Sequence, residues 1–165
     1  MARGDRMVAG TVGGLLGALT MDAVAVALAG PTGGWAALKC PAFPFAMHPG
    51  FDLPPLIASQ LSHGLIAIAW GMLFGLVFAK KRAATVFFAG LLWGLVVLVA
   101  MYYVVLPAFD MSGYVAKSGF LYSVAIHLGY GVGLGVGTAS LVGHGRRATS
   151  RRHDAWVPRA QGAEG

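Results

Sequence analysis

The chain alternates between long apolar runs and short polar segments. Four runs carry almost no charge and are long enough to cross about 30 Å of hydrocarbon, which takes about 20 helical residues. Helices are expected, because a backbone in lipid must satisfy its own hydrogen bonds, and the alternating segments of a membrane β-barrel are absent. The predicted spans are residues 8–29, 56–79, 83–106 and 120–142. The pattern predicts an all-α, four-span membrane bundle over residues 1–143, followed by a basic, disordered tail over residues 144–165.

The composition agrees with this pattern. Hydrophobic residues make up 57% of the chain and charged residues 11%, whereas a soluble domain carries about 25% charged residues. The chain also has 25 glycines, which membrane helices use for close packing. The single cysteine, Cys40, excludes an intramolecular disulfide and a cysteine-based zinc site. Composition therefore favours a protein whose surface is covered by lipid.

The basic residues predict the orientation. Ten of the 12 Lys and Arg residues lie on one side of the four predicted spans. They are Arg3, Arg6, Lys80, Lys81, Arg82, Arg146, Arg147, Arg151, Arg152 and Arg159. The other side has only Lys39, in a proline-rich loop over residues 30–55, and Lys117. Since positively charged segments stay in the cytoplasm, we expect both termini to be cytoplasmic.

Self-comparison indicates an internal duplication. With a shift of 64 residues, the second span aligns with the fourth and His63 falls on His127. Read at steps of four, the second span gives Ser59, His63, Ala67, Gly71, Gly75 and Ala79, and the fourth gives Ser123, His127, Gly131, Gly135, Ala139 and Gly143. Gly14 and Gly90 match more loosely in the other two spans. Residues four apart share a helix face, and small residues let backbones approach closely. We therefore expect two similar helical hairpins, related as parallel repeats.

Three ionisable residues lie inside the predicted spans. Asp22, His63 and His127 are each seven residues from the outer end of their span, a depth of about 10 Å at about 1.5 Å per residue. A carboxylate at such a depth must be paired or hydrated, and intramembrane ionisable groups are functional candidates by default. We expect the three side chains to meet inside the bundle, in its outer half.

Four interpretations of this site remain open. In the structural one, each imidazole bonds its neighbouring serine (Ser59 or Ser123) or a facing helix, and Asp22 accepts a hydrogen bond from a histidine. In the second, His63 and His127 ligate one b-type haem, and the columns of small residues make room for the porphyrin.

The third interpretation is a transition-metal site of His63, His127 and Asp22, with Met47 and Met111 as weaker thioether ligands. The fourth is a pathway for protons or a small solute, although the inner half of the four spans offers no ionisable residue to continue a relay.

The sequence contains no nucleophile elbow, Walker A loop, HExxH or dinucleotide fingerprint. Its alternating glycines at 129–137 lie inside an apolar span with no strand before them, so we reject a phosphate loop. We expect no enzyme acting alone and no nucleic-acid binding.

The run His127-Leu128-Gly129-Tyr130-Gly131 resembles a signature of small, uncharacterised bacterial inner-membrane proteins with four spans. The resemblance implies a bacterial inner membrane and a domain of unknown function, and it brings no catalytic residues. Our interpretation is a non-catalytic inner-membrane subunit or accessory protein. Its expected partners are the lipid bilayer and either a second copy or a larger membrane complex.

Overall fold

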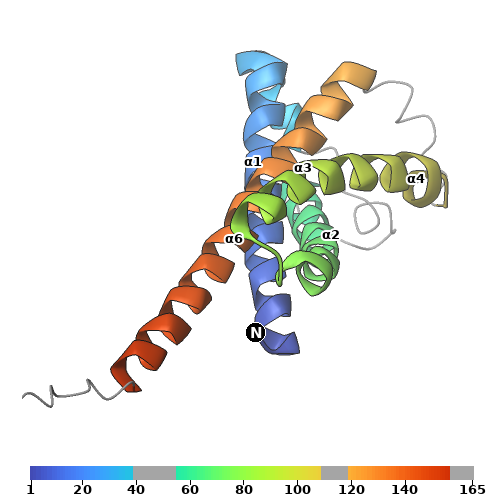
Figure 1. Ribbon diagram of the computed structural model, residues 1–165. Helices are drawn as coiled ribbons and strands as arrows, with labels where there is room; N and C mark the ends of the chain where they lie inside the picture. Colours follow the sequence, from blue (N-terminus) through green and yellow to red (C-terminus); the bar gives the residue numbers. More distant parts are fainter. Residues whose placement is uncertain (39–54, 109–118, 157–165) are drawn as a thin grey trace, which may run out of the picture.

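A computed structural model describes the backbone of residues 1–38, 55–108 and 119–156, and the side chains of residues 1–30, 56–108 and 119–142. Every regular element in these ranges is a helix (Figure 1). They are α1 (Arg3–Leu38), α2 (Pro55–Phe78), α3 (Ala83–Ala100), the π-helix η2 (Met101–Val105), α4 (Leu106–Ala108) and α6 (Phe120–Trp156). The predicted all-α class is confirmed for the described residues.

Four helical segments within these ranges are long and apolar enough to cross a membrane: Arg3–Gly30, Leu56–Phe78, Ala83–Ala108 and Phe120–Val142. They agree closely with the four predicted spans. The first ends where α1 kinks at Gly30, whose φ of 70° lies in the left-handed region that glycine adopts without steric penalty. Pro31 follows, and a residue before proline is disfavoured in helical geometry. The end of the bundle near Gly30 is called the Gly30 end below.

The third span contains one π-helical turn near the Gly30 end. Within η2 and its cap, the Leu106 N–H bonds to the carbonyl of Met101, five residues back. Pro107 follows at once, and proline cannot donate to the helical ladder and crowds the preceding turn. The wider turn accommodates this proline while the helix continues. Its extra residue changes the direction of the side chains around Tyr102.

Two rows of glycine on α6 explain the alternating glycines of the sequence. Gly129, Gly133 and Gly137 face α1: a Cβ on Gly133 would lie 2.4 Å from the carbonyl oxygen of Leu16. Gly131 and Gly135 face α3: a Cβ on Gly131 would lie 2.6 Å from the carbonyl oxygen of Gly90. Each row has the four-residue spacing of one helix face. α6 therefore packs at backbone distance against two helices at once.

α1 and α2 approach each other in the same way. A Cβ on Gly14 would lie 2.4 Å from the carbonyl oxygen of Ala67, and one on Gly71 would lie 2.4 Å from that of Gly10. The contact between α2 and α3 is instead made by large rings. Trp93 of α3 lies 6.1 Å from Trp70, 5.8 Å from Phe74 and 6.1 Å from Phe78 of α2, measured between ring centroids.

The fourth helix is longer than predicted. α6 continues to Trp156 and extends beyond the other helices (Figure 1), so residues 144–156 are helical where a disordered tail was expected. Arginine and alanine are good helix formers, and the first proline after the span is Pro158, so no proline interrupts the helix earlier. Most of the proline-rich loop, together with Met47 and Met111, lies outside the described residues.

Candidate functional site

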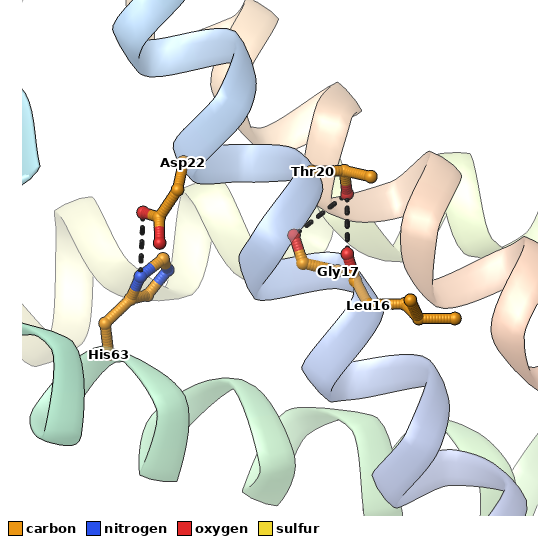
Figure 2. Close-up of polar contacts among 5 residues, drawn as sticks. All are labelled: Leu16, Gly17, Thr20, Asp22 and His63. Atoms are coloured by element: carbon orange, nitrogen blue, oxygen red, sulfur yellow. Dashed lines mark hydrogen bonds and ion pairs between the residues drawn. The ribbon is translucent and has the colours of Figure 1, made fainter. Parts of the chain in front are cut away.

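Asp22 and His63 meet between α1 and α2, toward the Gly30 end (Figure 2). His63 Nδ1 lies 3.2 Å from Asp22 Oδ1, while 11% of the His63 side chain and 21% of the Asp22 side chain are exposed. The nitrogen is buried but makes no well-aligned hydrogen bond. The two groups therefore lie at ion-pair distance but are not aligned for a hydrogen bond. The carboxylate oxygens can still accept hydrogen bonds from other donors.

His127 lies on α6 and is buried. Its Nδ1–H donates to the carbonyl oxygen of Ser123 at 2.8 Å, one turn earlier on the same helix. The Tyr102 ring packs edge-on at 6.2 Å between ring centroids. Three residues further along α6, the Tyr130 hydroxyl bonds to the carbonyl of Ala67, one turn from His63 on α2, so the two histidines lie on neighbouring parts of these helices. The third predicted residue is therefore in the same neighbourhood, although its ring is fixed by its own helix and not by Asp22.

The Tyr102 hydroxyl joins η2 to α6 beside His127. It hydrogen-bonds to the Ser123 hydroxyl, which itself donates to the carbonyl oxygen of Gly119 at 2.9 Å. Because the single serine proton is used in that second bond, Tyr102 acts as the donor to Ser123. The π-helical turn that carries Tyr102 thus brings a side chain of the third span to the site.

Two further hydroxyls tie the helices together next to the site. Thr20 Oγ1 lies 2.7 Å from the carbonyl oxygen of Gly129 on α6, closer than it lies to the carbonyls of its own helix at 2.9 and 3.0 Å, which Figure 2 shows. The buried Tyr130 hydroxyl donates to the carbonyl oxygen of Ala67 on α2 at 2.9 Å. These bonds connect α1 to α6 and α6 to α2. They therefore help to hold α2, which carries His63, in place relative to α6, which carries His127.

The predicted structural residues are all buried: Ser59, Ser123, Gly71, Gly75, Gly131 and Gly135. Sequence reasoning missed the contributions of Thr20 and Tyr102. The Thr20 hydroxyl bonds to backbone carbonyls, and a carbonyl acceptor leaves no signal in the identity of the partner residue. The position of Thr20 two residues before Asp22 was the available hint.

The structure bears on the two cofactor interpretations. The columns of small residues are filled by neighbouring backbones, as at Gly14 with Ala67 and Gly90 with Gly131, so they supply no space for a porphyrin. Among the described side chains, no three His, Cys, Asp or Glu residues are grouped so that they could hold a metal ion. The arrangement that remains is one carboxylate beside one imidazole, with a second imidazole near.

A search of protein-family models, curated proteins and solved structures finds nothing that matches this chain. The resemblance to small bacterial membrane proteins, noted at His127 and Tyr130, stays a prediction. What the sequence and the structure establish together, for residues 1–38, 55–108 and 119–156, is an all-helical architecture with four segments of membrane-spanning length.

Proposed function

We propose that this chain is a non-catalytic subunit or accessory protein of a bacterial inner membrane, and that the Asp22, His63 and His127 site is its functional centre. The observation that carries the proposal is the 3.2 Å contact between Asp22 of α1 and His63 of α2, both within apolar helices. Ionisable groups at such a depth are costly and mark functional positions. The glycine-packed helices around them form a rigid frame for this pair.

The test is a native-mass measurement on the tagged chain, extracted from its own membranes in a mild detergent. We expect a species heavier than the 17.1 kDa chain that contains other polypeptides. Asp22→Asn and His63→Gln should deplete this species, whereas Ser140→Ala, on the exposed side of α6, should leave it intact. Recovery of only the free chain from wild-type membranes would show that it is not a subunit.

The proposed orientation places the Gly30 end outside and both termini in the cytoplasm. It rests on the ten basic residues that lie on the side of the termini and of the turn between α2 and α3. Impermeant labelling of a cysteine placed at Lys81 or at residue 117, in a chain whose native Cys40 is replaced by serine, tests it in intact cells. Labelling at 117 alone agrees with the proposal, and labelling at 81 alone contradicts it.

The proposed internal duplication is supported by equivalent contacts. Gly14 of α1 meets Ala67 of α2, and Gly90 of α3 meets Gly131 of α6. The 64-residue shift that aligns His63 with His127 also aligns Ala67 with Gly131. Each half would then be a hairpin closed by small residues, with one histidine a turn nearer the Gly30 end.

The bond that holds the His127 ring favours a second candidate function, cofactor binding. Nδ1 of His127 donates to a backbone carbonyl, and a ligating histidine is oriented by such a bond from the nitrogen that does not bind the metal. Nδ1 of His63 lies 3.2 Å from a carboxylate without that alignment. An absorption spectrum and a metal analysis of detergent-purified protein decide this. A Soret band lost in both His63→Ala and His127→Ala would indicate haem, and one metal per chain without that band would indicate a metal site.

A further inference from the structure

Asp22 lies in an exposed apolar row of α1. Leu15, Leu19 and Val26 are exposed, and they stand at steps of three or four residues with Asp22 between them. They therefore share one face of the helix. Leu19, one turn from Asp22, is 64% exposed. We call Leu15, Leu19, Asp22 and Val26 the Asp22 face.

The carboxylate on this face is incompletely satisfied. Its one close polar contact among the described residues is His63 Nδ1, at 3.2 Å and without good alignment. An ionised carboxylate offers about four acceptor positions. The side chain is also 21% exposed, so part of it is reachable from outside the bundle. Lipid chains cannot donate to it.

This chain's own spans offer no Lys or Arg to complete the pairing. Residues 8–29, 56–79, 83–108 and 120–142 contain no Lys or Arg. A second copy of the chain would bring helices that equally lack Lys and Arg to the Asp22 face. A lysine or arginine charge at this depth would therefore come from a different polypeptide.

We propose that the Asp22 face is the docking surface for a transmembrane helix of a partner subunit, which presents a Lys or Arg to Asp22. The inference rests on the proposed function, because it identifies the chemistry of the partner. Ionisable residues inside membranes pair with one another, and the apolar neighbours of Asp22 provide the packing along which such a helix lies. His63 holds the carboxylate at the edge of the bundle, and the long basic side chain reaches it from the adjacent helix.

The test uses the full-length chain in liposomes with a designed Leu/Ala transmembrane peptide that carries one Lys at the depth of Asp22. The control peptide has Leu at that position. A fluorescence donor on an N-terminal tag and an acceptor on the peptide report association. We expect the Lys peptide to associate about three- to thirtyfold more tightly than the control, as expected for one polar contact between membrane helices. Equal association of both peptides with the wild-type chain would overturn the proposal.

Three variants make the result specific. Asp22→Asn, with nearly the same shape, should remove the preference for Lys. Leu19→Trp should block the face, whereas Leu92→Trp on α3, where the leucine is 67% exposed, should leave the preference unchanged. Helix content by circular dichroism shows that each variant is folded. A preference for Lys that survives in folded Asp22→Asn would contradict the proposed role of the carboxylate.

Carbodiimide labelling separates a basic partner from a proton as the occupant. Dicyclohexylcarbodiimide modifies protonated carboxyl groups in apolar surroundings, and mass spectrometry locates the adduct. Because an ionised carboxylate is not modified, we expect no adduct on Asp22 at saturating Lys peptide. An adduct on Asp22 under these conditions would show that the carboxyl group holds a proton and has no basic partner. Because these measurements require no native partner, they fail or succeed independently of the native-mass experiment.

Discussion

Substituting alanine at two glycines of α2 separates the two effects that a methyl group has in this bundle. A Cβ at Gly71 would lie 2.4 Å from the carbonyl oxygen of Gly10 and 2.7 Å from the Cα of Gly14, whereas a Cβ at Gly64 would meet nothing within 4 Å. The obstacles at Gly71 are backbone atoms, which cannot turn aside as a flexible side chain does. Gly71→Ala must therefore push α1 and α2 apart.

The expected magnitudes have opposite signs. Inserting a methyl group into a closely packed interface costs about 1–3 kcal/mol. Replacing glycine by alanine in a helix stabilises by about 0.5–1 kcal/mol where space allows. Gly64→Ala shows the second effect alone, and Gly71→Ala shows both. We expect the free energy of unfolding to fall in Gly71→Ala and to rise slightly in Gly64→Ala, a separation of about 1–3 kcal/mol between the variants.

The assay is reversible unfolding in mixed micelles with increasing SDS, followed by circular dichroism and by tryptophan fluorescence. Trp70 and Trp93 lie at the α2–α3 contact, so their fluorescence reports the same transition from inside the bundle. If Gly71→Ala proved as stable as Gly64→Ala, α1 and α2 would not be in backbone contact at Gly71, and the proposed frame around the site would have to be abandoned.

Three other substitutions test single contacts by the same assay. Tyr130→Phe removes the buried hydrogen bond to the Ala67 carbonyl and should lower the free energy of unfolding by about 0.6–2 kcal/mol. Tyr103→Phe, at an exposed ring, should leave it nearly unchanged. Equal effects of the two substitutions would show that Tyr130 does not make this bond. Thr20→Val keeps the shape of the side chain but loses the 2.7 Å bond to Gly129, so it should lower the free energy of unfolding by about 0.6 kcal/mol. An unchanged unfolding midpoint would show that the hydroxyl bonds only to carbonyls of its own helix. Arg6→Leu removes the 2.8 Å donation to the Leu76 carbonyl near the end of α2 and should lower stability by about 1 kcal/mol, with Arg3→Leu, at an exposed position, as the control that should not.

The spans were predictable because the length and polarity of a membrane helix are set by the bilayer, whatever its neighbours are. The shared level of Asp22 and His63 followed from counting residues along straight helices. The small residues at four-residue spacing indicated which of them share a helix face, but not which neighbouring helix packs against that face. That information depends on the packing of all four spans, and so the division of the α6 glycines between α1 and α3 emerged only in the structure.

Other features depend on geometry that no periodicity encodes. Tyr102 lies in the π-helical turn before Pro107, where the regular 3.6-residue spacing does not apply, and its ring packs beside His127. The helical stretch after Val142 was missed for a different reason. A basic, polar composition indicates solvent exposure, but it does not by itself prevent a helix from continuing.

The position of α6 in the chain has a consequence for biogenesis. This helix is synthesised after α1, α2 and α3, yet its two glycine rows contact both α1 and α3, and Tyr130 reaches α2. Until α6 has left the ribosome and entered the bilayer, the matching faces of the earlier helices have nothing to pack against, and Thr20 lacks its acceptor on Gly129. Before that point the chain offers only the α1–α2 glycine contact and the aromatic contact of α3 with α2, so the packing of the bundle is completed by its fourth span.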